Sequence, residues 1–271
     1  MAATRAPGRV LIAAGSDSGG GAGIQADIKT VTALGGFAMT AITALTAQNT
    51  TGVYGVVPVD PAFIAQQMRL VLDDLGADCA KTGMLHSAAV IETVVAVLDD
   101  RAPGLPLVAD PVMFAKGGHA LLEPAAMAVL RAVLIPRATI VTPNLPEAEA
   151  LAGIAVTDVE GMKRAGAAIL ALGAAAVLVK GGHLDSPVLT DLLMTRDGIE
   201  LFADARIDTR HTHGTGCTLA SAIATGLAAG LALDDAVRQA RAYVREAILQ
   251  APGFGAGHGP MHHAHTVVRR I

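Results

Sequence analysis

Short apolar runs alternate with longer amphipathic stretches along most of the chain. The apolar runs predict strands, at about Arg9–Gly15, Phe37–Ala47, Asp78–Gly83, Leu105–Asp110, Thr139–Thr142 and Ala175–Lys180. The amphipathic stretches predict helices, at about Ile24–Leu34, Pro61–Leu75, Ala88–Asp99, Pro124–Leu134, Glu147–Ala152, Val159–Leu172, Thr215–Ala229 and Leu233–Ile248. Such alternation is typical of parallel strands joined by crossover helices. The sequence therefore predicts an α/β fold with a mostly parallel sheet.

The pattern changes after Lys180. Two short apolar runs, Asp191–Thr195 and Ile199–Ala203, flank the turn signal Arg196-Asp197-Gly198, which predicts an antiparallel hairpin at one edge of the sheet. Since no internal repeat or low-complexity linker interrupts the chain, we expect one domain. Its active site should lie beyond the carboxyl ends of the parallel strands.

Composition narrows the possible partners. The chain has 271 residues, 52% of them apolar, with no Trp, two Tyr and five Phe, so surfaces for base stacking are scarce. The formal net charge is -4 and the basic residues are scattered, which disfavours nucleic acid as a partner. The two cysteines, Cys79 and Cys217, are too few for a disulfide framework and favour a cytoplasmic location. No apolar run reaches membrane-spanning length without a charge, Gly or Pro.

A glycine-rich loop, Gly15–Gly23, follows the first predicted strand and opens a helix. It matches neither the Walker A nor the dinucleotide pattern. Its five glycines exceed what a turn needs, which favours close approach of a ligand to the backbone. Asp27 follows on the apolar face of the next helix. Because a buried carboxylate needs a partner, it either serves the helix dipole at the solvent edge or accepts hydrogen bonds from a ligand.

Polar side chains end several predicted strands. Gln48 can donate and accept at once, which suits a heterocycle with an amine and a ring nitrogen; a polar strand terminus is an equally good interpretation. Met84 could lie against a planar ring, although a core methionine is commoner. Asp110 and Glu147 could hold a hydrated magnesium ion, or serve as a turn residue and a helix acid. Lys180 adds a cation to the same rim.

The segment Gly214–Cys217 opens an apolar helix. Its glycines and unpaired amides would let a negatively charged oxygen approach. A helix N-terminus lowers the pKa of a thiol, so we expect Cys217 to exist partly as thiolate, with a buried inert cysteine as the alternative. A metal at His211 and His213, or at His262, His263 and His265, is disfavoured because no cysteine or acid completes a set in the sequence.

Taken together, these segments resemble the hydroxymethylpyrimidine and phosphomethylpyrimidine kinases of thiamine biosynthesis, within the ribokinase-like superfamily. The resemblance spans nearly the whole chain. It is carried by Ala14–Asp17, Gly19–Asp27, Ile42–Thr50, Lys81–Leu85, Thr142–Ala148, Lys180–His183, Thr212–Thr218 and Gly257–Pro260.

The resemblance implies a fold and an activity. The fold would be a single-domain three-layer α/β/α sandwich over residues 1–271, with ends 1–8 and 253–271 flexible or lying on the surface. The activity would be ATP- and Mg²⁺-dependent phosphorylation of a hydroxymethylpyrimidine and of its monophosphate. A homodimer is also implied. Two alternatives remain: a pyridoxal kinase of the same superfamily, and a vitamin-binding relative without turnover.

The resemblance also implies roles for individual residues. Gln48 and Asp27 would read polar groups of the pyrimidine, while Gly15, Met84 and Val112 pack its ring. The phosphates would lie over Gly214–Cys217. The nucleotide would lie near Lys180, Gly214 and Thr215, and the metal near Asn144, Glu147 and Asp110. The catalytic residues would be Cys217, Gly214, Gly216 and Lys180.

Cys217 stands where the wider superfamily usually has an aspartate base. A phosphate monoester, with a second pKa of about 6, is already charged near neutral pH and needs no base, whereas an alcohol does. We therefore expect only the alcohol step to depend on Cys217.

Overall fold

The computed structural model describes residues 6–115 and 118–267. In this part of the chain nine strands form one sheet, in the order β3-β2-β1-β4-β5-β6-β7-β8-β9. The strands are β1 (Arg9–Asp17), β2 (Phe37–Asn49), β3 (Gly52–Pro58), β4 (Cys79–Thr82), β5 (Leu107–Ala109), β6 (Ile140–Val141), β7 (Ala176–Val179), β8 (Val188–Thr195) and β9 (Ile199–Ala205). Strands β2, β1, β4, β5, β6 and β7 pair in parallel, and β3, β8 and β9 are antiparallel at the two edges.

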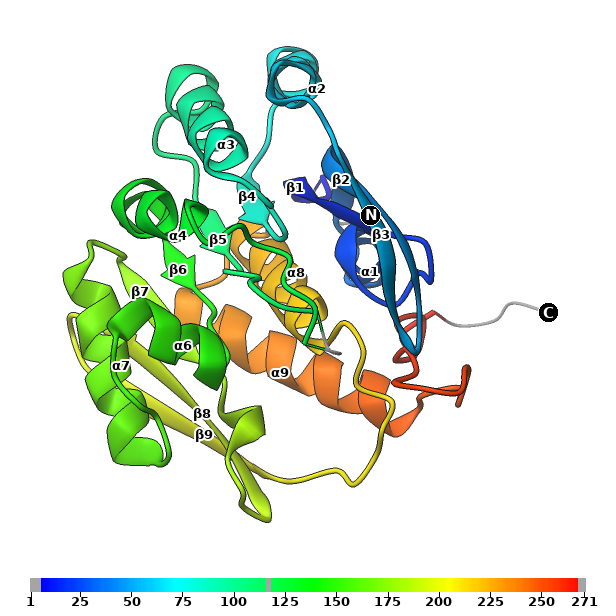
Figure 1. The fold of residues 1–271 in the computed structure, drawn as a ribbon, viewed down its shortest axis with the longest axis vertical. Helices are drawn as coiled ribbons and strands as arrows, with labels where there is room; N and C mark the ends of the chain where they lie inside the picture. The colour runs from blue at the N-terminus through cyan, green and yellow to red at the C-terminus, as the bar shows by residue number, and fades with distance from the viewer. Residues whose placement is uncertain (1–5, 116–117, 268–271) are drawn as a thin grey trace, which may run out of the picture.

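Helices cover both faces of the sheet (Figure 1). They are α1 (Gly23–Ala33), α2 (Pro61–Asp74), α3 (Ala88–Arg101), α4 (Ala126–Val129), α5 (Ile135–Arg137), α6 (Leu145–Ala152), α7 (Val159–Ala171), α8 (Thr215–Ala228) and α9 (Leu233–Leu249). The predicted three-layer α/β/α architecture, with antiparallel edges, is confirmed.

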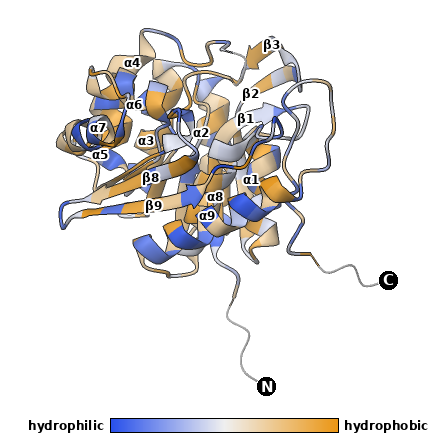
Figure 2. Ribbon diagram, turned by 90° about the horizontal axis from the view of Figure 1, so that it is seen from below, coloured by the Kyte–Doolittle hydropathy of each residue, from blue (hydrophilic) through white to orange (hydrophobic). Residues whose placement is uncertain are grey.

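The sheet has one apolar core on each face, and the side chains of each strand point alternately into one core and the other. In β1, Leu11 and Ala13 pack with the α2, α3, α6 and α7 layer, while Val10 and Ile12 pack with α1, α8 and α9. Successive side chains of a strand point to opposite faces, so a strand covered on both sides must be apolar throughout. Figure 2 shows the complementary pattern in α9, where hydrophobic and hydrophilic positions mix along one helix.

Two elements differ from the sequence prediction. Strand β3 was missed: it contains apolar residues, but Gly52, Gly55 and Pro58 interrupt them, and its side chains are half-buried or exposed. The helix predicted at Pro124–Leu134 begins at Ala126 and passes through a π-helical turn, Leu130–Leu134, before α5 ends at Arg137. Pro136 lacks an N–H to bond the carbonyl of Ala132, and such a gap favours a local change of helical register.

The chain ends also differ in part from the expectation. Residues 1–5 and 268–271 lie outside the described residues. Gly253–Ala256 are exposed as expected, but Met261 and His263 are only 3% and 4% exposed. The segment around them packs against α8 and α9 and is part of the core. Among the described residues, none of the helices has the length and apolar character that a membrane crossing needs.

Candidate active site

A cavity of about 910 Å³ opens beyond the carboxyl ends of the parallel strands. All the predicted site residues except Asp27 line it: Gly15, Gln48, Met84, Asp110, Val112, Asn144, Glu147, Lys180, Gly214, Thr215, Gly216 and Cys217. They come from six neighbouring strand ends and from the start of α8. The topology therefore collects residues that are dispersed along the sequence, at the place that a parallel sheet predicts.

One wall of the cavity is apolar and close to the glycine-rich loop. Met84, Ala44 and Leu121 form a small buried cluster, against which Val112 packs. A Cβ on Gly15 would lie 3.1 Å from the Met84 sulfur, so a larger residue at this position would crowd the wall. The sulfur, the Val112 side chain and the bare backbone of Gly15 together suit the edge or face of a flat ring.

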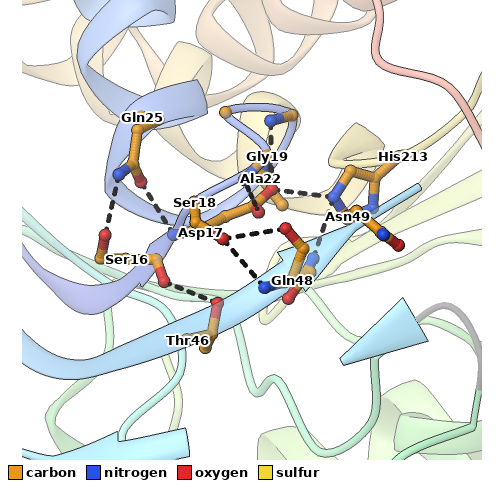
Figure 3. Close-up of polar contacts among 12 residues, drawn as sticks. Ser16, Asp17, Ser18, Gly19, Ala22, Gln25, Thr46, Gln48, Asn49 and His213 are labelled. Atoms are coloured by element: carbon orange, nitrogen blue, oxygen red, sulfur yellow. Dashed lines mark hydrogen bonds and ion pairs between the residues drawn. The ribbon is translucent and has the colours of Figure 1, made fainter. Parts of the chain in front are cut away.

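A polar network lies at the end of β1 and β2 (Figure 3). The Asp17 carboxylate accepts hydrogen bonds from the backbone amides of Gly19, Gly21 and Ala22, at 2.8, 3.1 and 2.8 Å. Nε2 of His213 lies 2.9 Å from Oδ2 of Asp17 and 3.1 Å from Nε2 of Gln48. Although burial favours the protonated acid, His213 and these amides hold the pKa of Asp17 below its ordinary value.

Asp17 and His213 were not among the predicted site residues. The available signals were an acid inside the glycine-rich loop and a histidine beside the Gly214–Cys217 segment. Neither residue type indicates its partner, because the two side chains are 196 positions apart in the sequence.

The placement of Asp27 differs from the expectation. Its carboxylate is fully buried and accepts hydrogen bonds from Nζ of Lys81, at 2.9 and 3.0 Å, and from Oγ of Ser221, at 2.7 Å. Burial opposes the charge of Lys81, but the Asp27 carboxylate raises the pKa of that ammonium. The expected partners were solvent or a ligand; the partner found is an internal lysine, and Asp27 does not line the cavity.

The opposite end of the cavity is built from the first turn of α8. Gly214 caps this helix with φ of 81°, and a Cβ there would collide with the carbonyl of Gly21. A Cβ on Gly216 would lie 3.1 Å from Nζ of Lys180. The amides of Gly216 and Cys217 have no partner within the helix, as for any first turn. Glycine at these positions keeps backbone amides and a cation close enough to act on one anionic group.

The protonation of Cys217 differs from the expectation. Burial is the largest of the effects that raise the pKa of its thiol to about 12; the carboxylates of Asp27 and Asp110 contribute to the rise, while Lys81 and a hydrogen bond from the Gly23 amide oppose it. The N-terminal position on α8 alone had predicted a lowered pKa. The loss of water around the thiol is the larger effect and favours the neutral thiol of Cys217.

Acidic groups meet Lys180 on the third side of the cavity. Nζ of Lys180 donates to Oδ1 of Asp110 at 3.0 Å and lies 4.0 Å from Oε2 of Glu147. Asn144 and Glu147 form a capping box at the start of α6, with 3.0 and 2.8 Å hydrogen bonds. Burial raises the pKa of Glu147 to about 7, with Lys180 opposing and Asp110 adding to the rise. Burial disfavours the charge of Lys180, but Asp110 and Glu147 raise its pKa.

Beyond Lys180 the cavity continues along the loop that follows β7. Arg206, which the sequence analysis missed, donates to the carbonyls of Gly182, Leu184 and Ser186, at 2.9, 2.6 and 2.8 Å. These bonds fix the loop backbone beside the cavity. A loop whose backbone is fixed beside Lys180 can hold the part of a phosphate-bearing ligand that extends beyond its phosphates.

Comparison with known proteins gives a consistent result. A family model described as phosphomethylpyrimidine kinase matches residues 17–262. A hydroxymethylpyrimidine/phosphomethylpyrimidine kinase of Bacillus subtilis is 46% identical over 256 residues, covering 94% of each chain. A thiamine biosynthesis bifunctional protein of Geobacter sulfurreducens is 50% identical over 96% of this chain, which spans 53% of that longer protein.

Solved structures agree with this result. A phosphomethylpyrimidine kinase from Clostridium difficile superposes with a TM-score of 0.79 at 43% identity, covering 89% of this chain and 99% of the other. A Bacillus subtilis pyridoxal kinase, solved as an ADP complex, superposes with a TM-score of 0.89 at 36% identity, covering 95% and 98%.

Proposed function

The chain belongs to the phosphomethylpyrimidine kinase family, and from that membership we propose that it phosphorylates 4-amino-5-hydroxymethyl-2-methylpyrimidine and then its monophosphate, in thiamine biosynthesis. One observation carries the proposal: a single cavity joins an apolar ring wall beside Gln48 to the Gly214–Cys217 amides and Lys180. A ring held at the first end brings its hydroxymethyl arm toward the second. Positioning and charge stabilisation are what phosphoryl transfer requires of a protein.

The residues divide the work as follows. Gly15, Met84 and Val112 hold the ring, and Gln48 hydrogen-bonds it. The Gly216 and Cys217 amides and the Lys180 ammonium face the charge that develops on the transferred group. The Cys217 sulfur takes the proton of the substrate alcohol in its thiolate form, which requires that the thiol first lose its own proton. ATP, the co-substrate, extends from Lys180 along the loop that Arg206 holds.

Magnesium fits this site as a mostly hydrated ion. Asp110 and Glu147 present carboxylates to the cavity, and Asn144 lies beside them. In the described part of the chain no group of three or more His, Cys, Asp or Glu side chains could cage a metal. Mg²⁺ does not need such a cage, since it keeps several waters and binds one or two carboxylates and the substrate phosphates. When bound, Mg²⁺ would neutralise part of the charge of the phosphates. The charge of the Asp110 carboxylate is already balanced by the Lys180 ammonium.

A pyridoxal kinase activity is the second candidate, since solved pyridoxal kinases superpose closely on this chain. They are less similar in sequence, at 33 to 36% identity, than the phosphomethylpyrimidine kinase structure at 43%. The hydroxymethylpyrimidine is therefore the better-supported acceptor.

We further propose that the enzyme works in the cytoplasm as a homodimer. The two cysteines support a reducing compartment: Cys79 is buried and Cys217 belongs to the cavity. The outer face of β2 and β3 supports the dimer, because Leu45 and Val57, which are partners in that ladder, are 49% and 63% exposed.

The activity is tested by steady-state kinetics of the purified chain with Mg²⁺ and ATP. The acceptors are the hydroxymethylpyrimidine, its monophosphate and pyridoxal. We expect turnover of both pyrimidines and a kcat/KM for pyridoxal at least tenfold lower than for the hydroxymethylpyrimidine. ATP consumption with pyridoxal alone would refute the proposal, and no consumption with any acceptor would support the relative without turnover.

A further inference from the structure

One ring nitrogen in the cavity faces two polar side chains at once. Nε2 of His213 lies 2.9 Å from Oδ2 of Asp17 and 3.1 Å from the Gln48 amide (Figure 3). A ring nitrogen of a neutral histidine carries either one proton or one lone pair in the ring plane. It can therefore donate to Asp17, or accept from Gln48, but not both.

Asp17 decides which of the two states is present. Its side chain is 3% exposed and already accepts hydrogen bonds from three backbone amides, as expected for an ionised carboxylate. A bare lone pair on Nε2 would face this negative oxygen at 2.9 Å, which is repulsive in a buried place. The favourable arrangement has the proton on Nε2, donated to Oδ2 of Asp17.

The side-chain amide of Gln48 must then point its oxygen atom toward His213. An NH₂ nitrogen at 3.1 Å from a protonated Nε2 would place two donors face to face. The oxygen and nitrogen of an amide have almost the same size, so a half-turn relieves this without changing the packing. Gln48 makes no other side-chain hydrogen bond among the described residues, and it lines the cavity. The half-turn therefore frees its NH₂ group for a ligand.

We infer that His213, held by Asp17, is a positioning residue that fixes the Gln48 amide with its NH₂ group toward the cavity, so that the site selects a ring with a hydrogen-bond acceptor at that point. The inference rests on the proposed function for the pyrimidine acceptor. In an aminopyrimidine that acceptor is an unprotonated ring nitrogen. Without Asp17 and His213 the amide could present either end, and the site would lose its preference between acceptor and donor.

The first test reads the tautomer in the wild-type protein and needs no activity. NMR of the chain labelled with ¹⁵N-histidine distinguishes a protonated from a bare Nε2. We expect the His213 signal to show a proton on Nε2. A bare Nε2 would overturn the inference whether or not the chain phosphorylates a pyrimidine.

The second test measures selectivity. The substrates are the hydroxymethylpyrimidine and two pyridine analogues, each with one ring nitrogen replaced by C–H. For the wild type we expect one analogue to lose roughly tenfold or more in kcat/KM, which is about the value of one hydrogen bond. In His213→Phe, which keeps the ring but has no N–H, this discrimination should fall to about twofold or threefold.

His213→Gln is the matched control, because the glutamine amide can donate from nearly the same place as Nε2. We expect it to keep most of the discrimination, which a merely structural role would not predict. Asp17→Asn, which removes the charge that holds the tautomer, should weaken the discrimination even if His213→Phe does not fold. Equal discrimination in the wild type, His213→Phe and Asp17→Asn would refute the inference. A wild type inactive on every pyrimidine would refute the proposed function instead, and the NMR result would still decide the tautomer.

Discussion

The protonation state of the Cys217 thiol depends strongly on the groups around it. Its place at the start of α8 favours a thiolate, but a helix dipole contributes only about 0.3 to 1 kcal/mol at an exposed site and up to about 2 in partly buried geometries. Burial and two nearby carboxylates act in the opposite direction and raise the pKa of the thiol to about 12. Lys81, itself buried with Asp27, opposes this rise. Only the thiolate form of Cys217 can accept the alcohol proton, so the base role requires Cys217 to lose its own proton once the substrates are bound, and a substrate that is already ionised needs no such base.

Replacing Cys217 by Ala should therefore affect the two phosphorylation steps unequally. We expect kcat/KM for the hydroxymethylpyrimidine to fall roughly 100-fold or more, the usual value of a general base, and that for the monophosphate to fall less than tenfold. Separate assays of the two acceptors give the ratio, and Cys217→Ser controls for the loss of side-chain volume. Equal losses in both steps would leave Cys217 with a structural role only.

The Asp27–Lys81 pair should be important for stability. Both side chains are 0% exposed, so removing one leaves a buried charge without a partner. We expect Lys81→Met or Asp27→Asn to lower the free energy of unfolding by about 3 to 5 kcal/mol, measured by urea denaturation. The double variant should lose less than the sum of the two. Lys163→Met, in the exposed pair with Glu160, is the control and should cost less than about 1 kcal/mol. A loss at Lys81 as small as at Lys163 would contradict the ion pair.

At the scale of elements, the segment after α9 supports the start of α8. The backbone amide of His213 donates to the carbonyl of Gly259 at 3.1 Å, and Oγ1 of Thr218 lies 3.0 Å from Nε2 of His263. The hydroxyl of Tyr243 in α9 donates to the carbonyl of His263 at 2.6 Å. These contacts tie the last part of the chain to the turn that carries Cys217. The segment therefore belongs to the framework of the site.

His263 should make the stability of this framework depend on pH. Burial lowers the pKa of its imidazole to about 4, from an ordinary value of 6.5. Between these two values the unfolded chain binds a proton that the folded chain does not, so the contribution is complete above pH 6.5 and is lost as the pH falls toward 4.

Urea denaturation at several pH values between 7 and 4 measures this dependence. We expect His263→Gln to lose less stability over that range than the wild type. His258→Gln, an exposed histidine in the same segment, is the control and should keep the wild-type dependence. If the slopes of the His263 variant and the wild type are equal, His263 is not the group responsible.

At the scale of the whole molecule, the cavity lies beyond the carboxyl ends of the parallel strands, and β2 and β3 form one edge of the sheet (Figure 1). Leu45 and Val57 on this edge are large apolar side chains that the chain itself does not cover. Burying them between two copies would remove them from water.

Leu45→Glu and Val57→Lys should therefore convert a homodimer to a monomer. Light scattering after size-exclusion chromatography measures the mass directly. Leu70→Glu, on the outer face of α2 and 64% exposed, is the control and should leave the dimer intact. A monomeric wild type would contradict the proposed dimer at once.

Much of this organisation could be predicted from the sequence. The spacing of apolar residues and the positions of turn residues can be read from short stretches of sequence, so they located the parallel strands, most helices and the β8–β9 hairpin. Strand β3 escaped because Gly52, Gly55 and Pro58, which disfavour a strand interior, interrupt its apolar residues. Glycines at 214 and 216 and the polar residues at strand ends predicted the cavity, because parallel strands must end at one edge.

What the sequence alone determined is therefore the layered sheet, the place of the cavity and most of the residues in its wall. Only the tertiary structure decided the protonation of Cys217, the partner of Asp27 and the Asp17–His213–Gln48 network. Asp27 and Lys81 are 54 positions apart, and Asp17 and His213 are 196 apart. Charge and protonation depend on burial and on such distant neighbours, and both exist only once the chain has folded.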